Sequence, residues 1–100
     1  MAPDGGWQLA ECLLPGITSA AAAALAERIV AELDGDAREH VSFLGAILMP
    51  DDEVLLCLFA GPPPLVRSVA ERSGLPFERI VPCAGIGWPA AGGSQDLRGG

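Results

Sequence analysis

The sequence predicts an α+β domain in which a four-stranded antiparallel sheet carries two helices on one face. Residues 53–81, EVLLCLFAGPPPLVRSVAERSGLPFERIV, show an apolar strand, a proline-rich stop, a short amphipathic helix and a return strand. Residues 7–49 show the same order with a longer helix. Two strand–helix–strand units in about 80 residues are typical of the split βαβ, or ferredoxin-like, plan with the order βαββαβ.

The first unit has local signals for each of its elements. Residues 7–14 form an apolar strand that ends at a Pro-Gly pair, which cannot readily extend a β-ladder. Thr18 or Ser19 can cap the following helix through its hydroxyl group, and Gly35 is expected to end the helix. Apolar side chains recur along this helix every three or four residues, so one face should be buried. The expected buried face consists of Ala22, Leu25, Ala26, Ile29, Val30 and Leu33.

The second unit begins with a hairpin. Residues 41–49 and 54–60 are apolar runs separated by a Pro-Asp-Asp turn. Residues 62–64, all proline, stop the strand and open the second helix, where a missing N–H costs no internal hydrogen bond. Gly74 ends this helix, and residues 80–83 form the last strand. The expected buried face of the second helix consists of Leu65, Val66, Val69 and Ala70.

The length of 100 residues suits a single domain. We expect this domain to span residues 7–88, after a flexible lead-in at 1–6 and before a disordered tail at 89–100, which has no apolar periodicity. Two helices cover only one face of the sheet, yet both alternating sets of residues 54–60 are apolar. The open face therefore needs a second cover, and a homodimer through that face is the simplest one.

The composition argues against several classes of protein. The formal net charge is −7, whereas nucleic-acid-binding domains obtain most of their affinity from basic patches. No apolar run approaches the ~20 residues needed to cross a bilayer, and the N-terminus has no signal-peptide pattern. We therefore expect no nucleic-acid or membrane partner and a cytoplasmic location. Three widely spaced cysteines fit reduced thiols in that compartment.

Glu11 is the best single candidate for a ligand or an acid–base group. It lies in an otherwise apolar strand, where a carboxylate must find a partner, reach water or take up a proton. The alternative is a structural role, either at the solvated end of the sheet or in an ion pair with Arg67, Arg72 or Arg79.

Cys12, Cys57 and Trp7 are further candidates for a binding site. The first and third strands of this plan are adjacent and central, so the thiols of Cys12 and Cys57 could lie near each other. With Cys83 on the neighbouring edge strand, a soft-metal or redox site is conceivable. The alternative is core packing, because free cysteine is commonly a small buried hydrophobe. Trp7 could stack on a ligand or pack within an interface.

His40 is the single histidine of the chain and lies at the entrance to the second strand. Nickel and zinc sites usually use several imidazole or thiolate ligands. His40 could therefore bind a metal only together with Glu11 or Cys57, or with its own counterpart across a dimer axis. The alternative is a histidine at the surface or the strand edge.

Three passages carry a resemblance to a known family: LPGIT at 14–18, CLFAGPP at 57–63 and VAERSGLPFERI at 69–80. The chain resembles the DUF4242 family of small domains, which includes a nickel-binding protein, over roughly residues 7–83. The resemblance implies a ferredoxin-like fold, usually a dimer, and in one branch nickel binding.

The resemblance also implies which residues would form the family's site. Glu11 matches a position that the family often fills with glutamate. The family typically has a histidine shortly before the Gly-Leu-Pro turn, where this chain has Ala70, and an acidic residue after the Cys-Leu-Phe strand, where it has Ala60. Nickel or another divalent transition metal is the one cofactor that the resemblance implies, with a site that lacks two of its usual ligands.

These observations predict a non-enzymatic, homodimeric domain that binds a small ligand or a metal ion on the open sheet face or across the dimer interface. The candidate ligand-binding residues are Glu11, Cys12, Cys57 and Trp7, and the candidate metal ligands are His40, Glu11 and Cys57; no residue is assigned a catalytic role. One alternative is a cofactor-independent enzyme of the dimeric α/β-barrel type, with Glu11 or His40 as its polar group. Another is a protein-interaction module.

Overall fold

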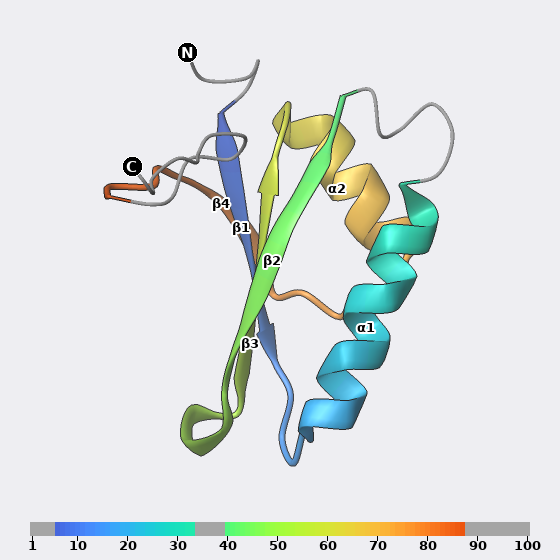
Figure 1. The fold of residues 1–100 in the computed structure, drawn as a ribbon, viewed down its shortest axis with the longest axis vertical. Helices are drawn as coiled ribbons and strands as arrows, with labels where there is room; N and C mark the ends of the chain where they lie inside the picture. Colours follow the sequence, from blue (N-terminus) through green and yellow to red (C-terminus); the bar gives the residue numbers. More distant parts are fainter. Residues whose placement is uncertain (1–5, 34–39, 88–100) are drawn as a thin grey trace, which may run out of the picture.

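The structure is a computed structural model that describes residues 6–33 and 40–87. Its elements follow the predicted order (Figure 1). The strands are β1 (Trp7–Leu13), β2 (Ser42–Met49), β3 (Val54–Ala60) and β4 (Arg79–Cys83), the helices are α1 (Ser19–Glu32) and α2 (Pro63–Arg72), and a 3-10 helix, η2 (Pro50–Asp52), forms the hairpin turn. The expected helix end at Gly35, residues 1–5 of the expected lead-in and the expected tail at 89–100 lie outside the described residues.

The four strands form one antiparallel sheet with the order β2-β3-β1-β4. Both helices lie on the same side of this sheet, to the right of it in Figure 1. This arrangement confirms the predicted α+β, ferredoxin-like fold. None of the described helices is long and apolar enough to span a membrane.

Local signals fix the helix ends. The Thr18 hydroxyl oxygen accepts a hydrogen bond from the Ala21 amide at 3.1 Å, so Thr18 is the N-cap of α1. Helix α2 starts with proline at its first position, and Gly74 follows its end with a φ of +75°. The expectation that Val30 and Leu65 are buried is wrong: their exposed fractions are 55% and 41%. Each lies at the margin of its apolar stripe, beyond the width that the sheet covers.

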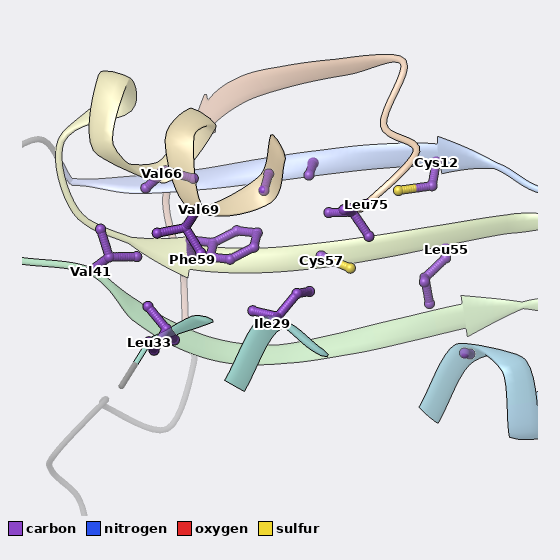
Figure 2. Packing of buried hydrophobic residues seen from close by; sticks show 13 residues of the cluster. Cys12, Ile29, Leu33, Val41, Leu55, Cys57, Phe59, Val66, Val69 and Leu75 are labelled. Atoms are coloured by element: carbon purple, nitrogen blue, oxygen red, sulfur yellow. The ribbon is translucent and has the colours of Figure 1, made fainter. Parts of the chain in front are cut away.

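The core lies between the helices and one face of the sheet (Figure 2). Successive residues of a strand point to opposite faces, so Ala10 and Cys12 of β1 face the helices together with alternate residues of β3. The largest fully buried side chain is Phe59, whose ring centroid lies 5.4 Å from that of Phe43. Burying an apolar side chain of this size contributes roughly 1.5–3 kcal/mol. Other members of the core are Ile29, Leu55, Cys57, Val66, Val69 and Leu75.

The two edge strands differ in composition. Strand β4 carries Arg79 and Pro82, whereas residues 42–49 of β2 contain neither a charged residue nor a proline. The pairing of β2 with β3 is instead interrupted by a bulge between Phe43 and Gly45. The irregular register falls where Gly45 adopts a φ of +136°.

Candidate functional site

The face of the sheet opposite the helices is the main candidate for a functional surface. Within the four strands its only charged side chains are those of Glu11 and Arg79. Leu13 and Ile47 on this face are 58% and 50% exposed. Large exposed apolar patches are typical of surfaces that bind another molecule.

This open face contains an apolar hollow of about 320 Å³. Its walls come from β1, β2, β3 and the end of β4, together with the two residues that follow β4. The residues that line it include Trp7, Leu9, Ile47, Leu56, Leu58 and Cys83. None of the lining residues is charged, so the hollow is suited to an apolar molecule.

Glu11 lies on the open face and pairs with Arg79, one of the three arginines considered from the sequence. The Arg79 Nε atom donates to Glu11 Oε1 at 2.8 Å, and Arg79 Nη2 donates to Oε2 at 3.1 Å. The hydrogen bond from Arg79 lowers the pKa of Glu11, with a further contribution from the positive charge. The carboxylate therefore stays ionised, and both of its oxygens are used in a structural pair.

Cys12 and Cys57 lie on the other, helix-covered face and have no exposed surface. Cys12 is opposite Leu55 and Cys57 is opposite Ala10, so the two cysteines are diagonal neighbours on adjacent strands. The neighbouring Cys12 thiol and burial both raise the pKa of Cys57. The neighbouring Cys57 thiol lowers the pKa of Cys12 against the effect of burial. The sequence-based expectation that these thiols are neighbours agrees with this arrangement.

Cys83 is separated from the other two cysteines by the sheet itself. It is the register partner of Trp7, and both side chains line the hollow on the open face. Burial raises the pKa of the Cys83 thiol. A site that combines all three cysteines is therefore not formed.

His40 is exposed and lies just before β2, near Gly61. Glu11 is two strands away and farther along the sheet, a separation of roughly 20 Å by strand geometry. Cys57 faces the core rather than His40 or Glu11. The candidate metal ligands are thus dispersed, and among the described residues no three His, Cys, Asp or Glu side chains gather in one group.

Four of the candidate site residues fall into two groups, and His40 lies apart from both. Trp7 and Glu11 share the open face, and Trp7 alone of the candidates lines the hollow. Cys12 and Cys57 share the core. The leucines of the hollow, such as Leu9 and Leu56, were not singled out from the sequence. The sequence does contain a signal for them. Alternate residues of a strand face opposite sides of the sheet, and in β1 and β3 many of the residues that face away from the helices are apolar as well.

No protein-family model matches the chain, and no curated protein matches it significantly. Among solved structures, the chain is similar to the crystal structure of SCO4226 from Streptomyces coelicolor A3(2), with a TM-score of 0.67 and 23% sequence identity. The similarity covers 78% of this chain and 95% of that chain. A structural similarity at this sequence identity shows a shared fold and gives no information about the functional site.

Proposed function

We propose that this protein is a non-enzymatic, homodimeric domain that binds a small apolar molecule between two open sheet faces. The observation that carries the proposal is the hollow of about 320 Å³ on that face. Binding sites for small molecules typically measure ~300–1,000 Å³ and have predominantly apolar walls. A cytoplasmic setting, in which the three free cysteines stay reduced, fits this role.

The proposed dimer follows from the chemistry of the same face. Its only charged side chains within the strands neutralise each other in the Glu11–Arg79 pair. A second copy can therefore cover this face without burying an unpaired charge, which would be costly. Such a cover would also close the hollow, which is open in the part of the chain that the structure describes.

An apolar organic ligand is better supported than the metal ion that the resemblance to DUF4242 implies. The proposed membership of that family rests on the three shared sequence passages. The donors that a metal site would need, His40, Glu11 and Cys57, lie in three separate places. The enzymatic alternative has less support, because the carboxylate oxygens of Glu11 are both engaged by Arg79 and the described wall of the hollow has no charged residue.

Ligand binding can be tested with N-phenylnaphthylamine, a neutral fluorophore that brightens in apolar sites. Trp88→Phe leaves Trp7 as the sole tryptophan, since the chain has two. We expect saturable binding with energy transfer from Trp7, which lines the hollow. Leu56→Gln should weaken binding roughly tenfold or more, because the amide would be desolvated without a partner.

Leu13→Gln is the matched control for this experiment, because Leu13 lies on the same face but not in the hollow. It should leave the affinity for the probe unchanged at a protein concentration where the dimer persists. Equal weakening by the two substitutions, or binding that does not saturate, would contradict the proposed site.

The dimer can be tested by size-exclusion chromatography with light scattering at micromolar concentration. We expect twice the chain mass of 10.2 kDa. Leu13→Arg or Ile47→Arg should produce monomers, because each would place unpaired positive charges inside the interface. Val30→Arg is the control, since Val30 on α1 is 55% exposed but lies on the opposite side of the sheet. A monomeric parent protein would refute the interface.

A further inference from the structure

We infer that Cys12 and Cys57 form an oxidation site, at which a small hydroperoxide closes the two thiols into a reversible disulfide between β1 and β3. This inference is independent of the proposed ligand-binding function, because both thiols lie on the helix-covered face and neither lines the hollow. The site is also distinct from Cys83, which lies on the opposite face of the sheet.

The register of the sheet brings the two thiols together. Cys12 and Cys57 are diagonal neighbours across the antiparallel β1–β3 pair. Figure 2 shows their side chains on adjacent strands, with the side chain of Leu75 between them in this view. The opposite effects of the two thiols on each other's pKa agree with this placement.

The surroundings favour a disulfide over other products of two thiols. The core cluster around Cys12 and Cys57 includes Leu55, Phe59 and Leu75, and the charge of Glu78 at the surface also acts on Cys12. A monovalent soft metal held by two thiolates would carry a net negative charge into this core, where an unpaired charge is costly. A disulfide is neutral and smaller than two thiols, so it can remain buried.

The reaction balances with a hydroperoxide as the oxidant. The sulfur of one thiolate attacks the terminal peroxide oxygen; an S–O bond forms, the O–O bond breaks, and the remaining alkoxide or hydroxide takes a proton. The second sulfur attacks the resulting sulfenic acid; the S–S bond forms, the S–O bond breaks, and water leaves. Two thiols lose two electrons and two protons, and the peroxide is reduced to an alcohol, or water, plus water.

The register also predicts that the disulfide is easily reduced. Diagonal neighbours have Cα atoms roughly 7–8 Å apart, whereas a relaxed disulfide spans ~4.4–6.8 Å. Closing the bond therefore requires β1 and β3 to shift relative to each other and leaves the bond under strain. Strained disulfides are reduced more readily than the relaxed ones of secreted proteins. The pair is suited to reversible closure rather than to permanent cross-linking.

The burial of the thiols determines how an oxidant reaches them. Both have no exposed surface, so oxidation requires a transient opening of the core. Leu75, in the segment after α2, is part of the same cluster. Leu75→Ala should accelerate oxidation several-fold, because it makes this opening more frequent.

The test uses the full chain with Cys83→Ser, which leaves only the pair. After treatment with hydrogen peroxide under native conditions, the protein is denatured and alkylated, and its intact mass is measured. We expect the number of alkylated thiols per chain to fall from two to none, with the loss of two hydrogen atoms. Peptide mapping should find Cys12 linked to Cys57, and dithiothreitol should restore both thiols. The thermal midpoint should change on oxidation and return on reduction.

Cys12→Ala and Cys57→Ala, each combined with Cys83→Ser, are the matched controls. Each retains one thiol and should form no internal disulfide. The parent protein, mapped in the same way, keeps the test valid if a variant fails to fold. The inference is overturned if both thiols of the folded protein remain alkylatable, if the chain gains oxygen atoms without an S–S link, or if the link joins two chains.

Discussion

Arg79 and Glu11 form a two-point ion pair across strands β4 and β1, with contacts of 2.8 Å and 3.1 Å. The two residues are directly opposite in the register of these strands. Opposite charges at such positions stabilise the pairing of neighbouring strands. The pair thus attaches the start of edge strand β4 to the centre of the sheet.

This pair should make stability depend on pH in the acidic range. The pKa of Glu11 is lowered from its ordinary value of 4.5, chiefly by the hydrogen bond from Arg79. The ion pair therefore contributes fully to stability above pH 4.5. This contribution is lost as the pH falls through the lower pKa that Glu11 has in the folded protein. In urea unfolding, the free energy of unfolding of Glu11→Gln should be slightly lower than that of the parent at pH 7. This difference should disappear near pH 3. Arg79→Gln, followed by NMR titration, should return the Glu11 pKa toward its ordinary value; an unchanged value would contradict this cause.

Gly61→Ala should be strongly destabilising. A Cβ atom at this position would lie 2.6 Å from the His40 carbonyl oxygen, and the φ of Gly61 is +144°. Strain of this kind costs about 1–3 kcal/mol, and the clash with backbone adds to it. Gly16→Ala is the control, because Gly16 also has a positive φ but nothing within 4 Å of its Cβ position. Gly16→Ala should lower the free energy of unfolding in urea by only about 1 kcal/mol. Equal losses for the two substitutions would show that the backbone near Gly61 moves to relieve the clash.

Thr18→Ala should destabilise the protein by about 1 kcal/mol. The substitution removes the oxygen that accepts from the Ala21 amide at 3.1 Å. Ser19→Ala is the control, since Ser19 is the first residue of α1 and alanine favours the helix. Chemical denaturation followed by circular dichroism should rank Thr18→Ala below Ser19→Ala in stability. The reverse order would assign the cap to Ser19.

Val66→Ala and Leu65→Ala should differ in cost although the residues are adjacent in α2. Val66 has no exposed surface, whereas Leu65 is 41% exposed. Val66→Ala should cost about 2 kcal/mol through lost burial and a residual cavity. Leu65→Ala should cost less than about 1 kcal/mol. Urea unfolding of the two variants measures the difference, and similar costs would place Leu65 in the core.

The order of the elements could be predicted from the sequence because the signals for it are local. Strand β3 was expected at residues 54–60 and is Val54–Ala60. Its beginning follows the Pro-Asp-Asp turn, and its end is enforced by the glycine and prolines that follow. The expected strand at 80–83 begins one residue earlier, at Arg79, which joins the ladder opposite Glu11.

The site was less predictable because it depends on register. The sequence offers three arginines, Arg67, Arg72 and Arg79, as partners for Glu11. In the structure Arg72 pairs with Glu32, and Arg67 lies over the ring of Phe77. These contacts follow from how the helices dock and cannot be read from spacing. The face occupied by Cys83 likewise depends on its alignment with Trp7 in the β1–β4 pair.

The unlike edges of the sheet limit how the molecule can assemble edge to edge. A further strand cannot pair regularly along β4, since Pro82 lacks an N–H. Strand β2 has no such block, and the bulge at Gly45 leaves only part of its length regular. A molecule with one permissive edge can add a neighbour on that side alone, so pairing of β2 with β2 closes at two copies. Continuous growth into a fibre would require the edge that Pro82 obstructs.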